Sequence, residues 1–451
     1  GLVGFGLIPS NFRDSEGDTL GGIGSGIDIK RGTWAQTAFG SYNGTFVVTP
    51  DRGYNVEGAI DYQSRQHEID FVFSPYYGSS KLSFSDAQDT LVLTYRKTVL
   101  RYERNNVKTS GLDPTAVRAA QSGFPSDPTA DPQMPIASTS EPRLTIDAEG
   151  LVADDDGSFW VSDEYGPYIY KFSADGQLLQ TIQPPAAILP MDKNGNLEFT
   201  SEDDPKTGRG GNHGLEGLTI DRVNRILYAM LQAATIQDGG DERDTSRYTR
   251  LLAWNVSDSS VRPPLIGEWV VPLPLSDKDN TQECSEIHFV KPGIFLALSR
   301  DGDGHGGDDN NTKYKQADLF SIIGATDIHG TKYDDPANPI ASDGDLKSGI
   351  TPATYLSFVD FVEENGLERF GLHNDDPADE TLIDAKWESL TLAPCFDSEY
   401  PDDFFLFTAA DNDYLTKNGM SLGESYDADI NVDNQFLVFR VTLPGATPYN
   451  S

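Results

Sequence analysis

The chain has 451 residues, and its 34 Lys and Arg against 71 Asp and Glu leave a formal charge of −37. A field of this sign repels polyanions, so nucleic acids and anionic membrane surfaces are disfavoured as partners, and the charge favours a monomer. Hydrophobic residues make up 37% and aromatic residues 10% of the chain, which is enough for a sizeable core. No apolar run approaches the roughly 18 residues of a membrane span. The composition predicts a folded, soluble, acidic protein.

The cysteine count and the glycosylation motifs indicate the compartment. Cys284 and Cys395 are the two cysteines of the sequence, which excludes a disulfide-rich miniprotein and a Cys-rich zinc module, and we expect them to form one disulfide. N-x-[ST] motifs occur at Asn43, Asn255 and Asn310, each among turn-forming residues. With the acidity and the low lysine content, these features predict a secreted glycoprotein.

Two-strand units recur along the chain, each a short strand, a turn and a second apolar strand, which ends in a charged residue in every unit but the third. In every unit but the first, the opening strand carries a glutamate. The units are, in chain order, 24–27 with 46–51, 147–151 with 159–164, 214–218 with 226–231, 285–287 with 294–301, and 387–390 with 404–411. Such pairs are typical of β-hairpins. Because repeated hairpins must bury their faces against one another, the repetition predicts a β-propeller.

The spacing of these units predicts an all-β fold, a single propeller of six or seven blades with long loop insertions. The glutamates of the middle units are 67 and 70 residues apart, which fits four strands plus an insertion. The interval before the first glutamate and the interval before the last are longer and leave room for further blades. We expect one domain over 1–451, with an N-terminal segment over about 1–20 and a loop insertion over about 105–140.

The repeated glutamates are Glu149, Glu216, Glu286 and Glu388. In a propeller the innermost strand of each blade lines the central channel, so residues at the starts of these strands recur at one depth around the axis. We therefore expect the four carboxylates to converge at one mouth of the channel. An alternative interpretation is that they cap turns or pair with arginines across blades.

The same residues carry a resemblance to a known family. The segment 147–151, DAEGL, followed by GSFWVSDEYGP at 157–167, resembles the phytase-like family, also called esterase-like activity of phytase. Segments 20–27 and 49–53 are similar to that family's first blade. The similarity extends from about residue 21 to about 441. The resemblance implies a secreted β-propeller and a hydrolase activity.

Side chains for chemistry accompany the repeated strands. His213 and His288 adjoin them and are the candidate general acid and base, because imidazole changes charge close to neutral pH, and Glu149 and Glu216 are the candidate catalytic carboxylates. Further polar residues at the same mouth are candidates for binding the substrate: Arg52, Arg143, Glu164, Tyr165, Arg300 and Lys386. The four cations among them would hold an anionic group.

Hard oxygen ligands dominate the chain, which favours Ca²⁺ over zinc. One candidate calcium site is the glycine-rich loop that carries Asp301, Asp303 and Asp308. A second lies in the channel, with ligands among Glu149, Glu286 and Glu388. An alternative interpretation of the acidic loop is a solvated turn.

Three classes of function fit these residues. The leading hypothesis is a secreted, metal-assisted hydrolase acting in the channel on an ester or phosphoester of a polyhydroxylated, sugar-like or inositol-like compound. The runner-up is a calcium-dependent polysaccharide lyase acting on a uronate-containing glycan, and a lactonase-like reaction is a further alternative. A non-catalytic ligand-binding propeller is the third class. The expected partner is in each case a small molecule or a glycan.

Overall fold

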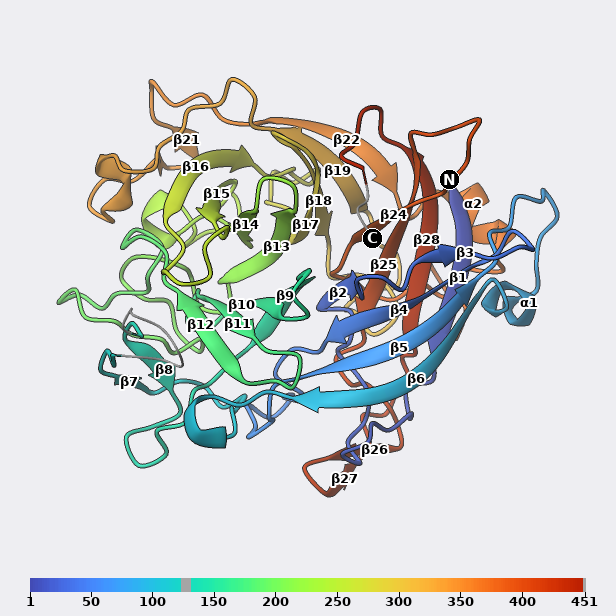
Figure 1. Cartoon of the computed structure of the whole chain (residues 1–451), viewed down its shortest axis with the longest axis horizontal. Helices are drawn as coiled ribbons and strands as arrows, with labels where there is room; N and C mark the ends of the chain where they lie inside the picture. The colour runs from blue at the N-terminus through green and yellow to red at the C-terminus, as the bar shows by residue number, and fades with distance from the viewer. Residues whose placement is uncertain (123–130, 449–451) are drawn as a thin grey trace.

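The structure, a computed structural model, describes residues 1–122 and 131–448, which form a β-propeller of five blades. Figure 1 looks down the axis of the ring, with the first strand of each blade nearest the centre. Every blade is an antiparallel sheet. The first blade consists of β2 (Gly26–Ile29), β4 (Tyr42–Thr49), β5 (Arg65–Phe73) and β6 (Leu91–Leu100), with the short β3 (Ala35–Gln36) on β4.

The next three blades are simple four-stranded meanders. The second consists of β9 (Ala148–Ala153), β10 (Phe159–Asp163), β11 (Ile169–Phe172) and β12 (Leu178–Ile182). The third consists of β13 (Leu215–Asp221), β14 (Ile226–Leu231), β15 (Tyr248–Asn255) and β16 (Leu265–Pro272). The fourth consists of β17 (Cys284–Lys291), β18 (Ile294–Arg300), β19 (Lys315–Ser321) and β22 (Thr354–Asp360).

The fifth blade closes the ring by combining both ends of the chain. Its inner strand is split into β23 (Lys386–Trp387) and β24 (Thr391–Pro394), both paired with β25 (Asp403–Asp411). Outside them, β28 (Asn434–Thr442) pairs with β1 (Leu2–Ile8). Part of the expected N-terminal segment is therefore the outermost strand of the last blade, and it covers the outer edge of β28.

The remaining elements are short insertions between strands. Three hairpins are β7 (Ala116–Arg118) with β8 (Met134–Ile136), β20 (Ala341–Ser342) with β21 (Asp345–Leu346), and β26 (Gly419–Ser421) with β27 (Glu424–Tyr426). The helices are α1 (Phe84–Gln88) and α2 (Glu364–Arg369), with 3-10 turns at Arg104–Asn106, Ile236–Asp238 and Lys332–Asp334. Within the described part of the chain, no helix is both long and apolar enough to cross a membrane.

The prediction of six or seven blades is wrong because insertions occupy the long intervals between the repeated glutamates. The interval before Glu149 holds one blade, followed by the hairpin β7–β8 and its loops. The interval before Glu388 holds the outer strands of the fourth blade, the hairpin β20–β21 and α2. Sequence spacing measures chain length, and chain length does not distinguish a blade from a long loop.

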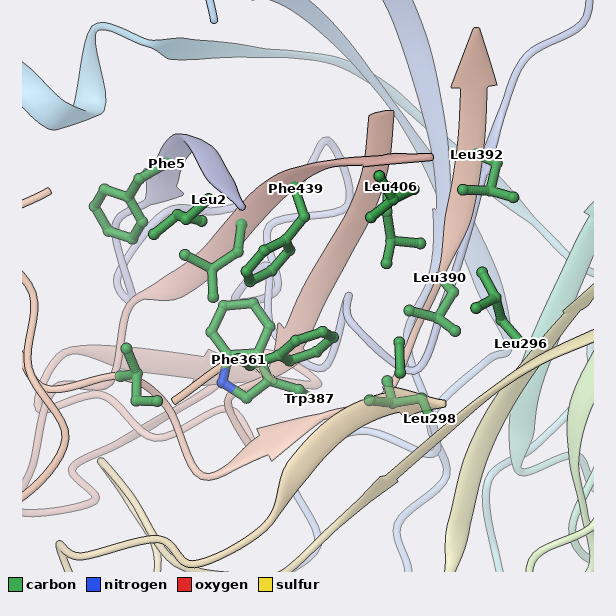
Figure 2. Close-up of a cluster of buried hydrophobic side chains, with 14 of the residues drawn as sticks. Leu2, Phe5, Leu296, Leu298, Phe361, Trp387, Leu390, Leu392, Leu406 and Phe439 are labelled. Atoms are coloured by element: carbon green, nitrogen blue, oxygen red, sulfur yellow. The ribbon is translucent and has the colours of Figure 1, made fainter. Parts of the chain in front are cut away.

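The core lies between adjacent blades rather than in one central layer. Figure 2 shows the cluster between the fourth and fifth blades, where Leu296 and Leu298 of β18 face Trp387 and Leu406. Phe361 meets Trp387 edge-on at 6.2 Å and stacks on Phe439 at 5.0 Å. Full burial of each such side chain contributes about 1.5–3 kcal/mol. These interfaces fix how the inner strands are placed around the axis.

Glycines allow the inner strands to approach closely at the axis. A Cβ on Gly26 would lie 2.3 Å from the carbonyl oxygen of Glu149, and one on Gly150 would lie 2.5 Å from the Cβ of Leu218. Side chains do not fit at such distances. In each Glu-Gly pair of the repeat, the glutamate supplies a carboxylate, and the glycine next to it allows the neighbouring inner strand to pack closely.

Candidate active site

Charged side chains gather at one mouth of the channel because of strand direction. The inner strands begin there, and the second strand of each blade ends there because it runs antiparallel to the first. Five buried carboxylates from the inner strands and the adjoining loops form what we call the acid mouth: Asp147, Glu149, Glu164, Glu216 and Glu388. The convergence predicted from the repeat is confirmed for Glu149, Glu216 and Glu388.

Three of these residues form the group best suited to a metal ion. Asp147, Glu149 and Glu164 each offer a carboxylate oxygen, and the three oxygens lie within 4.8 Å of one another. Asp147 Oδ1 and Glu164 Oε1 are buried and accept no hydrogen bond from the described residues. Buried oxygens without donors are costly unless a cation or a proton joins them. This acidic triad can therefore bind a metal ion through hard oxygen ligands.

A network of backbone hydrogen bonds holds the triad in place. Asp163, at the end of β10, accepts from the backbone N–H of Asp147 at 2.9 Å and from that of Tyr165 at 3.1 Å. The backbone N–H of Glu164 donates to the carbonyl of Asp147 at 3.0 Å. Asp163 thus locks the two segments that carry the triad together. Burial raises the pKa of Asp163 to about 7.

Burial and mutual repulsion raise the proton affinity of the acid mouth. The pKa of Glu149 lies well above its usual range because of burial first, and then because of Glu216 and Asp147. Burial, followed by Glu164 and Glu388, raises the pKa of Glu216 in the same way. The pKa of Asp147 is also raised by burial, although Arg52 opposes the shift. The cluster therefore attracts either protons or a cation.

Three cations surround these carboxylates. Arg52 Nε lies 3.3 Å from Asp147 Oδ2, and the guanidinium of Arg300 donates to Glu388. Lys386 Nζ donates at 2.6 Å to Asp411 and at 2.7 Å to Asp413. The side chains of Arg52, Arg300 and Lys386 remain 19%, 14% and 28% exposed. They reach solvent at the rim of the mouth, where an anion can contact them.

Tyr165 positions Arg52. Its hydroxyl donates to the carbonyl of Gly111 at 2.7 Å and accepts from Arg52 at 3.2 Å. Burial, and then the charge of Asp147, raise the pKa of this phenol well above its usual value. A phenol held in its protonated form is a poor base, so its contribution is to orient the guanidinium.

His213 reaches the same mouth from the loop before β13. Its Nε2 lies 3.1 Å from Glu283 Oε1, and the side chain is 31% exposed. Burial opposes protonation, but the hydrogen bond and charge of Glu283 outweigh it, so the pKa of His213 is raised. The pKa of Glu283 is lowered, because His213 stabilises its anion against the cost of burial. The raised pKa favours the imidazolium form of His213, which can donate a proton.

Two residues that matter here were assigned no role from the sequence. Asp147 belongs to the triad, and Glu283 sets the charge of His213. Asp147 stands two residues before Glu149, which places both on one side of an extended segment, so the period of two was the available signal. Glu283 precedes β17, and the sequence carries no pattern that singles it out.

The prediction that Glu286 joins the other glutamates is wrong, because the repeat is offset by one residue in the fourth blade. In the fourth blade Glu286 pairs with Leu298, and the equivalent pair in the third blade is Gly217 with Met230. Ser285 therefore occupies the position that corresponds to Glu216. The Glu286 carboxylate instead accepts from the backbone N–H groups of Leu218 at 2.8 Å and Ile287 at 2.9 Å. It ties two blades together.

His288 lies toward the other end of the channel, away from the acid mouth. It lines a cavity there together with Asp28 and Arg222. Burial lowers its pKa to about 4, so the imidazole is neutral near pH 7. The structure therefore separates the two histidines that the sequence analysis placed together.

Asp301 of the acidic loop and Arg143 have protein partners. Asp301 accepts from Lys315 Nζ and from the backbone N–H of Tyr314, both at 3.0 Å, and Asp308 is exposed. Asp303 is partly buried, and burial raises its pKa. Arg143 forms ion pairs with Asp61 and Glu141 at the surface. The cation of Lys315 thus occupies the position beside Asp301 that a calcium ion was expected to take.

The expected disulfide is absent, because the two cysteines belong to different interfaces. Cys284 packs between the third and fourth blades, and Cys395 packs between the fifth and first. Both are free and buried. Among the sequon asparagines, Asn43 is exposed on β4, whereas Asn255 accepts from Ser257 and Asn310 donates to Asp376.

The fold and the site together define a five-bladed propeller with a buried acidic triad at one channel mouth. Residues 29–363 match the family model "Phytase-like: Esterase-like activity of phytase". A protein of Arthroderma benhamiae, described as an uncharacterized secreted protein, is 37% identical over 461 residues, covering 93% of this chain and 88% of that one. The chain belongs to the phytase-like family, and the resemblance seen in the sequence is confirmed.

Two solved structures resemble the chain distantly. A luciferin-regenerating enzyme aligns with a TM-score of 0.26 at 9% identity, covering 95% of both chains. Zg3597, a family 117 glycoside hydrolase of Zobellia galactanivorans, aligns with a TM-score of 0.31 at 8% identity, covering 97% of this chain and 91% of that one. Similarity this low carries no argument about function.

Proposed function

We propose that the protein is a secreted, metal-assisted hydrolase that cleaves an ester or phosphoester of a polyhydroxylated compound at the acid mouth. The observation that carries the proposal is the buried triad with two carboxylate oxygens lacking donors, set among three cations. The family description, esterase-like activity of phytase, supports the reaction class. The relative described as a secreted protein supports the location.

Asp147, Glu149 and Glu164 would hold the metal ion, and Ca²⁺ is the proposed metal because all the ligands are hard oxygens. Bound there, such an ion polarises a phosphoryl or carbonyl oxygen and neutralises charge in the substrate. The chain carries a formal charge of −37, which opposes an anionic substrate. Local positive charge at the mouth is therefore needed for binding.

Residues of the chain perform the remaining steps. Arg52, Arg300 and Lys386 bind the anionic group at the rim, and Tyr165 keeps Arg52 in position. Protonated His213 holds one proton on Nε2 against Glu283 and offers the other, on Nδ1, to the leaving group. Glu216, which is not one of the three metal ligands, is the carboxylate that accepts a proton from water, and its raised pKa strengthens it as a base.

The test is phosphate release from phytate and from simple phosphate monoesters, with added Ca²⁺ and again after chelation. We expect calcium-dependent release that falls by about a hundredfold or more in Glu164→Gln, because the triad loses one ligand. Glu424→Gln, an exposed carboxylate of β27, is the matched control and should retain full activity. Calorimetric titration with Ca²⁺ measures metal binding separately from turnover.

Absence of phosphate release under both conditions would contradict the phosphoesterase proposal. Carboxyl esters, lactones and uronate-containing polysaccharides are then assayed with the same variants. A rise in absorbance from unsaturated uronate products would establish the lyase alternative instead.

A further inference from the structure

The other end of the channel holds a cavity that the proposed function leaves unused. Its volume is ≈ 100 Å³, and the inner strand of every blade lines it. One apolar contribution from each blade, in chain order, is Ile27, Leu151, Leu218, Phe289 and Leu392. Ala446, Thr447 and Pro448 cross beside it, tied to β17 by the N–H of Thr447, which donates to the carbonyl of Val290 at 2.9 Å. We call this space the far cavity.

The charged groups of the far cavity are already satisfied by one another. Asp28 accepts from the backbone N–H groups of Ile29 and Ala153, both at 2.8 Å, and from Arg222 at 3.2 Å. Arg222 also donates to the carbonyl of Ala153 at 2.6 Å, and Arg31 pairs with Asp155 at 2.7 Å. The lining itself has two arginines and one aspartate, and Asp155, which lies outside the lining, pairs with Arg31, so each arginine has a carboxylate partner.

His288 differs from these groups. Its ring lines the cavity, and neither ring nitrogen forms a hydrogen bond to the part of the chain that the structure describes. Burial keeps the imidazole neutral, so it offers one donor and one acceptor. The ring is only partly buried, so its nitrogens are accessible to a hydrogen bond from a ligand with a single polar group.

We propose that the far cavity is a second binding site, which takes a small uncharged molecule with an apolar ring and one hydroxyl or carbonyl group that hydrogen-bonds to His288. The apolar walls favour the ring, and the internally paired charges give no advantage to an anion or a cation. An apolar protein cavity of about 150 Å³ is sufficient to bind benzene. The far cavity is smaller, but it reaches the surface at Val223, whose side chain is 58% exposed. Part of the ligand can therefore extend out of the cavity beside Val223.

Phenol and benzene are the probes, because they differ by one hydroxyl group. Binding to the full chain is measured by calorimetry and by ligand-detected NMR. We expect phenol to bind at millimolar concentrations or below, and His288→Leu to weaken phenol about five- to tenfold while changing benzene binding less than about twofold. His329→Leu, a histidine on the exposed surface, is the matched control and should bind both probes like the unmodified protein.

A second variant keeps the proposal testable if His288→Leu fails to fold. Val223→Trp places a large ring at the cavity edge from an exposed position, and we expect it to reduce the binding of both probes at least tenfold. The proposal would be overturned if phenol did not bind at concentrations up to about 10 mM. It would also be overturned if His288→Leu bound phenol as tightly as the unmodified protein does. Phosphate release at the acid mouth is measured in parallel, so that a failure of the far-cavity proposal can be distinguished from a failure of the proposed function.

Discussion

The two ends of the channel are built from the same five inner strands, yet they have opposite chemistry. At the acid mouth the strands begin with carboxylates that crowd one another, and His213 is held toward its charged form by Glu283. At the far cavity the same strands contribute mainly apolar side chains, and burial keeps His288 neutral. The protonation state of a histidine near an inner strand therefore depends on the end of the channel at which the histidine lies.

The largest expected effect comes from removing a cation at the acid mouth. Arg300→Met leaves the carboxylate of Glu388 buried with only Lys386 nearby, at 3.6 Å. Because removing one partner of a buried ion pair is strongly destabilising, we expect the free energy of unfolding to fall by about 3 kcal/mol in urea titrations.

Arg96→Met is the matched control for this effect. Arg96 pairs with Asp70 at 3.4 Å on an outer strand, where both side chains are about half exposed. Its loss should cost less than about 1 kcal/mol. Equal destabilisation by the two variants would show that the acid mouth is no more sensitive to charge than the outer surface.

The second effect is a pH dependence of opposite sign at the two ends. His288 has a pKa of about 4 in the folded protein against 6.5 as its ordinary value, so the unfolded chain binds a proton that the folded one lacks between these values. The protein therefore loses stability as the pH falls from about 6.5 to 4, and His288 accounts for about 2–3 kcal/mol of this loss. The charged groups that face His288 are Asp28 and Arg222. His288→Leu should remove this contribution in urea titrations at pH 7 and pH 4.

At the acid mouth the sign is reversed. The pKa values of Glu149 and Glu216 are raised, so the folded protein binds protons that the unfolded chain releases, and stability falls as pH rises above about 4.5. Glu149→Gln should flatten this part of the profile and leave the His288 part intact. Parallel pH profiles for Glu149→Gln and His288→Leu would contradict the difference between the two ends.

The third effect is stabilisation by a cation at one end alone. At a tenfold excess of free Ca²⁺ over its dissociation constant, binding to the folded state adds about 1.4 kcal/mol to the free energy of unfolding. Thermal melts with and without a chelator measure it. We expect Glu164→Gln to lose the gain and Glu424→Gln to keep it, whereas a gain retained in Glu164→Gln would place the cation elsewhere.

The smallest expected effect concerns the two cysteines. Because Cys284 and Cys395 lie in different interfaces, a reducing agent should leave the melting temperature unchanged within about 1 °C. Mass spectrometry after alkylation should find no modified cysteine in the folded protein and two after unfolding without reductant. Joined peptides under non-reducing conditions would contradict the free thiols.

The sequence by itself determined the propeller class and the mouth at which the chemistry gathers. Both depend on local patterns, since hairpin periodicity identifies the strands and antiparallel pairing sends the start of one strand and the end of the next to the same place. Glu149, Glu216, Glu388, Arg52 and Arg300 were found in this way. The Glu-Gly pairs also stand where neighbouring strands meet at the axis.

Only the tertiary structure decided the blade count, the ligand set and the separation of the histidines. Loop and blade have similar chain lengths, so spacing overestimated the blades. A one-residue offset in β17 moved Glu286 out of the acid mouth, and nothing in the local pattern marks it. Lys315 satisfied Asp301, and the depth of His288 set its charge, because ion pairing and burial arise only when distant segments meet.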